Sequence, residues 1–102
     1  MRKNEQKFTC QLRTISQIIS EYELQQINLL KLDCEGAELS AILGITDSDW
    51  AKIQQVVVEV HDIEGRLETI QNILTQNGLD KQVIEKEKSL EKTKLYNIYA
   101  RR

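Results

Sequence analysis

An apolar run that breaks off into acidic residues and a glycine most constrains the fold of this chain. Residues 27–38 read Ile-Asn-Leu-Leu-Lys-Leu-Asp-Cys-Glu-Gly-Ala-Glu. The apolar part predicts a strand of the kind that is buried on both faces in a parallel sheet, and Asp33, Glu35 and Gly36 stand where this strand meets a helix. A second run, Val-Val-Val-Glu-Val-His-Asp at residues 56–62, ends in the same way. Because ligands bind at the carboxyl ends of strands in open α/β sheets, two strands can bring acidic and imidazole groups to one edge.

Composition and charge narrow the class of protein. With 102 residues, of which 40% are hydrophobic, the chain is long enough for one modest core, and we expect a single soluble domain over residues 1–102. The formal net charge of -2 leaves no strongly basic face for phosphates, which argues against nucleic acid and anionic membranes as partners. No apolar run approaches the roughly 20 residues of a membrane span, and the first residues lead into no signal-like segment, so we expect a cytoplasmic protein.

The cysteines favour neither a disulfide framework nor a zinc site. Cys10 and Cys34 lie in strand-like apolar surroundings, and we interpret both as reduced core residues. Tetrahedral zinc sites are usually built from clustered Cys and His, whereas this chain has one histidine, His61, and no Cys-x-x-Cys pair. The sequence therefore predicts no zinc centre.

The rest of the chain alternates between strand-like and helix-like patterns. Phe8, Cys10 and Leu12 alternate with polar residues, as in a strand that is covered on one face. Thr14 and Gln17 have the spacing of a capping box at the start of a helix. The further elements that we expect are a helix over residues 15–23, a strand over 27–34, a short helix over 37–43 with Leu39, Ile42 and Leu43 inward and Gly44 at its end, a helical turn capped by Asp47, a strand over 55–61, a helix around 67–74 that ends at Asn77-Gly78, and strands over 79–85 and 95–100 that form a terminal antiparallel hairpin.

The two strands that end near Asp33 and His61 should be parallel neighbours. A helical connection between parallel strands is right-handed in almost all proteins, which places the two strands side by side with helices packed against the sheet. If Asp33 is level with His61, then Lys31 lies opposite Glu59, because both pairs are 28 positions apart. The sequence thus predicts a structural ion pair inside the sheet, since an unpaired buried charge is costly.

Several segments spread over most of the chain match the pattern of one known family. They are Leu-Leu-Lys-Leu-Asp-Cys-Glu-Gly-Ala-Glu-Leu at residues 29–39, the spacer through Trp50, Val-Val-Val-Glu-Val-His at residues 56–61, the helix end at residues 74–78, and Leu-Arg-Thr-Ile-Ser at residues 12–16. Together they resemble the FkbM-type methyltransferases, which depend on S-adenosylmethionine. Ser16 departs from the family pattern, because an Asp is common at that place.

The resemblance implies an α/β fold, namely the C-terminal half of a class I (Rossmann-like) methyltransferase domain. Such a half has a mixed sheet with parallel strands, flanking helices and a terminal antiparallel hairpin. The N-terminal half, which grips the cofactor through a glycine-rich turn and an acidic residue, would be absent, and none of the four glycines here belongs to a Gly-x-Gly arrangement. We therefore expect residues 1–102 to be one partial domain that by itself binds S-adenosylmethionine weakly and is inactive.

His61, Asp33 and Glu35 are the candidate catalytic residues. Methyl transfer to a hydroxyl needs an electrophilic methyl group, which the sulfonium of the cofactor supplies, and a base for the acceptor oxygen. Histidine is the side chain best suited to exchange protons near neutral pH, which makes His61 the candidate base, although a lone His at a strand end is also compatible with a purely structural role. Asp33 and Glu35 could hold an acceptor or orient His61, but carboxylates before a helix are also common caps. They are too few oxygen ligands to predict a metal ion.

The sequence favours a C-terminal fragment of an S-adenosylmethionine-dependent O-methyltransferase that contributes the acceptor-side rim of the active site. The family resemblance implies a small-molecule hydroxyl acceptor, such as a sugar or a natural product. The alternative is a non-catalytic α/β interaction module derived from that fold. In a truncated sheet the strand at Ile27 would have an open edge, which either the strand at Phe8 or a second copy of the chain could cover, the latter by self-association.

Overall fold

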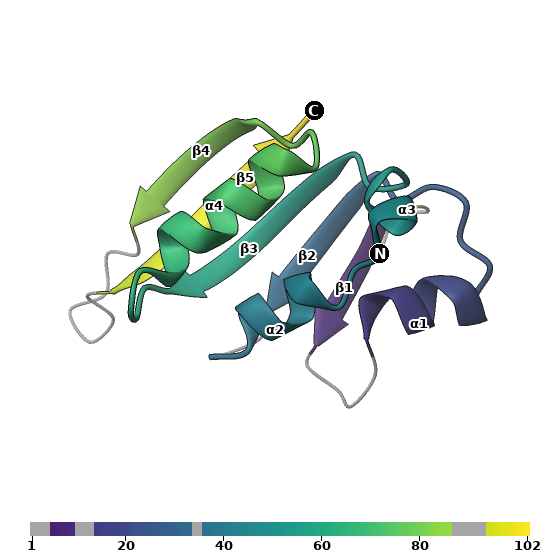
Figure 1. Cartoon of the computed structure of the whole chain (residues 1–102), viewed down its shortest axis with the longest axis horizontal. Coiled ribbons are helices and arrows are strands. Elements are labelled where there is room, and N and C mark those ends of the chain that lie inside the picture. Colours follow the sequence, from purple (N-terminus) through teal and green to yellow (C-terminus); the bar gives the residue numbers. More distant parts are fainter. Residues whose placement is uncertain (1–4, 10–13, 34–35, 87–93) are drawn as a thin grey trace.

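The computed structural model of the chain describes residues 5–9, 14–33, 36–86 and 94–102, which form a five-stranded mixed sheet with flanking helices (Figure 1). The elements are β1 (Glu5–Thr9), α1 (Ile15–Glu21), β2 (Leu29–Asp33), α2 (Glu38–Leu43), α3 (Asp47–Trp50), β3 (Gln55–His61), α4 (Arg66–Gln76), β4 (Lys81–Lys86) and β5 (Leu95–Arg101). The strand order is β1-β2-β3-β5-β4. β1 and β3 run parallel to β2, whereas β5 is antiparallel to β3 and β4. The expected mixed sheet with a terminal hairpin is therefore confirmed.

β2 and β3 are parallel neighbours, as the sequence predicts, but their register differs from the expected one. Lys31 is level with Val57 rather than with Glu59, so Asp33 falls two residues short of the level of His61. Side chains alternate along a strand with a period of two, so this slip leaves every side chain on its expected face. The predicted ion pair between Lys31 and Glu59 is wrong, since the ion pairs among the described residues do not include it.

β1 pairs with the edge of β2 that lies away from β3. The two strands pair from Glu5 opposite Leu29 to Thr9 opposite Asp33. The strand pattern that the sequence shows over residues 7–13 thus begins earlier, at Glu5, and residues 10–13, with the predicted core residue Cys10, lie outside the described part, as does Cys34. Of the two ways to cover the edge of β2, the chain uses its own N-terminal strand, and the edges of the described sheet are β1 and β4.

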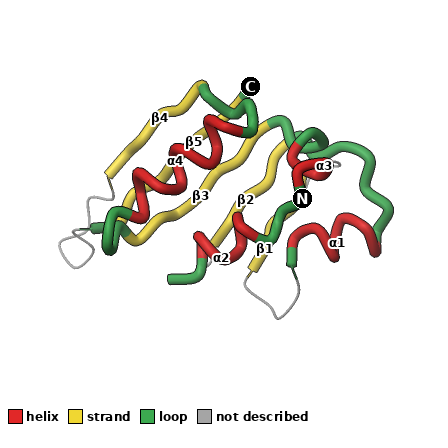
Figure 2. The backbone as a smooth tube through the Cα atoms, viewed as in Figure 1, coloured by secondary structure: helices red, strands yellow, loops and turns green. Residues whose placement is uncertain are grey.

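The helices cover one face of the sheet. Figures 1 and 2 show α4 in front of β3 and β5, and α2 in front of β2, and these elements are in contact. Along β3, Val56, Val58 and Val60 are buried on this inner face, whereas Val57 and Glu59 alternate with them on the opposite face and are partly exposed. We call this opposite face the outer face. β2 alternates in the same way, so the expectation that it is buried on both faces is wrong. None of the described helices is long and apolar enough to cross a membrane.

Thr14 and Gln17 form the expected capping box of α1. The main-chain N–H of Gln17 donates to Thr14 Oγ1 at 3.0 Å, and the main-chain N–H of Thr14 donates to Gln17 Oε1 at 2.7 Å. α1 then buries Ile15 and Ile19 and ends two residues earlier than expected. The sequence pattern therefore predicts the start of this helix correctly and places its end two residues too late.

Two details of the segment that contains α2 and α3 differ from the expectation. Leu43 is 66% exposed rather than inward, because Glu38 and Ile42, four residues apart on one face of α2, take the buried positions. The N-cap of α3 is Thr46 rather than Asp47, since Thr46 has the extended backbone of a cap and Asp47 is already helical.

Asp49 connects α3 to its surroundings through side-chain hydrogen bonds. The hydroxyl of Thr46 donates to Asp49 Oδ2 at 3.1 Å, and Lys52 Nζ lies 3.1 Å from Asp49 Oδ1. Burial alone would raise the pKa of Asp49, but hydrogen bonds from Ser16, Lys52 and Thr46 outweigh it and hold the pKa below its usual value. Asp49 therefore stabilises the folded chain as a carboxylate.

We expect Asp49→Asn to lower the free energy of unfolding at pH 7 by about 1 to 2 kcal/mol, because it removes hydrogen bonds to a charged group. The folded-state pKa of Asp49 lies below its unfolded value, so the carboxylate stabilises the fold above the unfolded pKa, and this contribution is lost as the pH falls through the folded pKa. In urea unfolding, the difference between wild type and variant should shrink from pH 7 to about pH 2.5. The matched control is Asp47→Asn, at an exposed position of the same short helix. A difference that stays constant with pH would contradict the role of Asp49.

Candidate active site at the carboxyl ends of β2 and β3

The carboxyl ends of β2 and β3 form one edge of the sheet, and the candidates Asp33 and His61 are the last residues of these strands. Because the strands are parallel neighbours, both residues lie at this edge, which we call the C-terminal edge. Asp33 is exposed, and the side chain of His61 is 32% exposed. Glu35 lies outside the described residues, so its place beside them stays a prediction.

Glu38 contacts His61 directly, although it was not among the predicted site residues. Its side chain is fully buried at the start of α2, and Oε1 accepts a hydrogen bond from the main-chain N–H of His61 at 2.7 Å. The same oxygen lies 3.3 Å from Nδ1 of the His61 ring. Residues four apart share one face of a helix, so the apolar Ile42 is the pattern that could have indicated a buried Glu38.

Arg66 approaches the same carboxylate from the start of α4. Its Nη1 lies 3.6 Å from Glu38 Oε1 and donates to the main-chain oxygen of Gly36 at 3.2 Å. The second oxygen of Glu38, Oε2, is buried and has no hydrogen-bond partner among the described residues. α2, β3 and α4 therefore meet at a single oxygen atom beside the ring of His61.

A tight turn between β3 and α4 places Arg66 at the C-terminal edge. Glu64 and Gly65 both have a positive φ, of 56° and 75°. Asp62 Oδ1 accepts a hydrogen bond from the main-chain N–H of Leu67 at 3.1 Å, which satisfies one of the free N–H groups at the start of α4. An L residue such as Glu64 is strained in this backbone conformation, so the turn stores strain next to the candidate site.

The described residues at the C-terminal edge form neither a metal-binding cluster nor a glycine-rich cradle. Within the described ranges, no group of three or more His, Cys, Asp and Glu side chains could hold a metal ion. Gly36 and Gly65 are the glycines near this edge, and they belong to separate turns rather than to one glycine-rich cradle for a nucleotide. The described residues therefore do not fit S-adenosylmethionine as its main binding elements.

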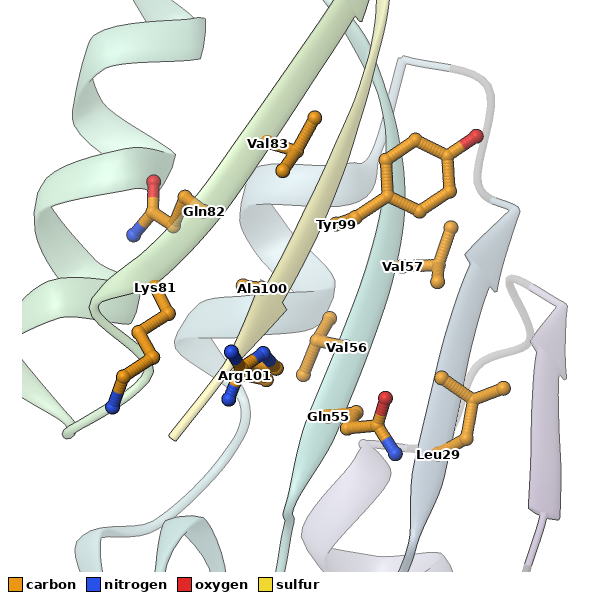
Figure 3. Close-up of a pocket in the computed structure, with 10 residues that line it drawn as sticks. All are labelled: Leu29, Gln55, Val56, Val57, Lys81, Gln82, Val83, Tyr99, Ala100 and Arg101. Atoms are coloured by element: carbon orange, nitrogen blue, oxygen red, sulfur yellow. The ribbon is translucent and has the colours of Figure 1, made fainter.

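The outer face of the sheet carries a hollow of about 430 Å³. Figure 3 shows its lining, in which Tyr99 of β5 pairs with Val57 of β3 on one side and with Val83 of β4 on the other. A second hollow of about 370 Å³ shares Tyr99 and Val57 and extends to Asp33. His61 lines neither hollow, so the imidazole and the hollows belong to different parts of the surface.

The chain belongs to a methyltransferase family. The family model described as "Methyltransferase FkbM domain" matches residues 2–90, which confirms the resemblance that the sequence motifs indicate.

Three relatives illustrate the extent of the similarity. The chain is 38% identical over 96 residues to the AMB antimetabolite synthetase AmbE of Pseudomonas aeruginosa, which covers 89% of this chain and 4% of that protein. It is 36% identical over 88 residues to the 31-O-demethyl-FK506 methyltransferase FkbM of Streptomyces tacrolimicus, covering 86% of this chain and 34% of the relative. With Methyltransferase 1 of Beauveria bassiana it shares 33% identity over 92 residues, covering 89% and 37%. The chain thus spans about a third of the length of FkbM and of Methyltransferase 1, and no solved structure matches it.

We expect Glu64→Gly to raise the free energy of unfolding by about 0.5 to 1 kcal/mol, because glycine adopts the positive φ of this position without strain. The matched control is Glu68→Gly in the first turn of α4, where the backbone is helical, and it should lower the free energy of unfolding by about 0.5 to 1 kcal/mol. Urea unfolding at neutral pH measures both values. If the two substitutions destabilise the chain equally, Glu64 is not strained.

Proposed function

We propose that this chain supplies the acceptor side of the active site of an O-methyltransferase that uses S-adenosylmethionine. The observation that carries the proposal is the parallel pairing of β2 with β3, which brings Asp33 and His61 to one edge of a sheet in a chain of the FkbM methyltransferase family. The relative from Streptomyces tacrolimicus is named for 31-O-demethyl-FK506, and this name supports an oxygen atom as the methyl acceptor.

In this proposal His61 removes the proton of the acceptor hydroxyl, while Asp33 and Glu35 hold the acceptor through hydrogen bonds. The partial exposure of the imidazole supports its role, because a base must reach the substrate. Asp33 also borders the second hollow of the outer face, but His61 does not line it, so the acceptor hydroxyl is placed at the strand ends between Asp33 and His61 rather than in the hollow. The acceptor class that the family resemblance suggests is the hydroxyl group of a sugar or a natural product.

We also propose that residues 1–102 correspond to the C-terminal half of a class I methyltransferase domain and that further sequence supplies the cofactor cleft. Two observations support this. The chain spans only 34% of FkbM and 37% of Methyltransferase 1, and it contains no Gly-x-Gly turn.

We expect His61→Ala, made in a full-length protein that contains this chain, to lower kcat by about 10²- to 10⁴-fold, because the acceptor loses its base. The affinity for S-adenosylmethionine, measured by calorimetry, should stay nearly unchanged. The control is Gln55→Ala at the opposite, amino end of the same strand, which is exposed and should leave kcat unchanged. Unchanged turnover in His61→Ala would remove the assignment of the base.

The second candidate is a non-catalytic interaction module, which has the fold of a methyltransferase domain but no enzymatic activity. The observation that favours it is the outer face, where Val83 and Tyr99 are 59% and 41% exposed. Apolar side chains in such a position are compatible with a partner or a second copy of the chain.

Calorimetric titration with S-adenosylmethionine separates the two candidates. If the chain is part of a methyltransferase, the full-length protein should bind the cofactor, and the 102-residue chain should bind it weakly or not at all, because its glycines form no cradle. Absence of binding by both proteins would contradict the enzyme and favour the module. Sedimentation of the chain over a range of concentrations then tests self-association.

A further inference from the structure

We infer that Glu38 is a positioning residue that fixes the tautomer and the orientation of the His61 ring for proton transfer. This inference rests on the proposed function, in which His61 is the base. It goes beyond that proposal because it assigns a role to a buried carboxylate that does not reach the acceptor.

The hydrogen bonds around Glu38 Oε1 determine which ring nitrogen of His61 carries the proton. Oε1 accepts from the main-chain N–H of His61 at 2.7 Å and lies 3.6 Å from the guanidinium of Arg66. An oxygen that faces these donors is an acceptor, so Nδ1 of His61, at 3.3 Å, is the donor of the third contact. In the neutral ring the proton then sits on Nδ1, and Nε2 keeps the lone pair that a base needs.

The same contacts also fix the direction of the ring. Oε1 binds both the main chain and the imidazole of one residue, which holds the backbone and the side chain of His61 in a single arrangement. Arg66 holds the carboxylate from the other side and is itself bound to the main-chain oxygen of Gly36. A carboxylate that orients a histidine in this way is a recurrent arrangement in acid–base catalysis, where it selects the tautomer.

A purely structural role explains only part of this arrangement. An anchor between α2 and β3 requires the bond to the main-chain N–H of His61, but not the contact with the ring. Moreover, Glu38 is fully buried and its Oε2 has no partner among the described residues, an arrangement that costs stability rather than adding to it. The costly carboxylate is therefore better explained by its effect on the imidazole.

The first test measures directly which ring nitrogen of His61 carries the proton. Two-bond ¹H–¹⁵N spectra of the labelled 102-residue chain, at a pH where His61 is neutral, report which ring nitrogen is protonated. We expect protonated Nδ1 and unprotonated Nε2 in the wild type. A ring protonated mainly on Nε2 would overturn the inference, and this test does not depend on whether a variant folds.

The second test compares Glu38→Gln with Glu68→Gln, which removes the same charge at an exposed position of α4. Glu38→Gln should increase the fraction of His61 with the proton on Nε2, because the neutral amide is a weaker acceptor for Nδ1–H. In a full-length protein it should lower kcat at least about tenfold with little change in KM for the acceptor. Glu68→Gln should change neither the tautomer nor kcat.

These measurements separate the failure of the inference from that of the proposed function. If Glu38→Gln lowers Tm but changes neither the tautomer nor kcat, Glu38 is only an anchor, and the positioning role is wrong while His61 can still be the base. If His61→Ala leaves kcat unchanged, the proposed base is wrong and Glu38 has no proton transfer to support, whatever tautomer the spectra show.

Discussion

The parallel pairing of β2 with β3 is the constraint on which the rest of the structure depends. It aligns alternate Leu and Val side chains of both strands on the inner face, where α2 and α4 bury them. The same alignment brings the carboxyl ends of the strands to one edge, so that the turns into α2 and α4 place their first residues side by side. Core packing and the candidate site are therefore two results of one pairing.

Much of the fold could be predicted from the sequence because its determinants are local. The expected bounds of β3 match the structure, the capping box at Thr14 was predicted from two residues, and Asn77-Gly78 ends α4 as expected. The register between β2 and β3 was not predictable in the same way, because it depends on pairing between segments that are distant along the chain. An apolar run also does not indicate whether one face or both faces of the strand are covered. In β2 the described helices cover only the inner face.

The candidate site was predictable only in part. Asp33 and His61 were identified because each follows an apolar run, and the structure places both at the C-terminal edge. Glu38 was missed because its partner lies 23 positions away and because the helix was predicted with Leu43 inward. Ile42 by itself indicates the buried face correctly, because the residue four positions before it, Glu38, lies on the same face.

The two-residue offset between β2 and β3 gives the C-terminal edge a stepped profile. β3 continues beyond the level of Asp33 by a rise of roughly 7 Å, so Asp33 stands on the lower step and His61 on the upper one. A molecule that contacts Asp33 on the lower step therefore has the imidazole of His61 beside it rather than beneath it. To touch both groups at once, an acceptor has to be long enough to span the height of the step.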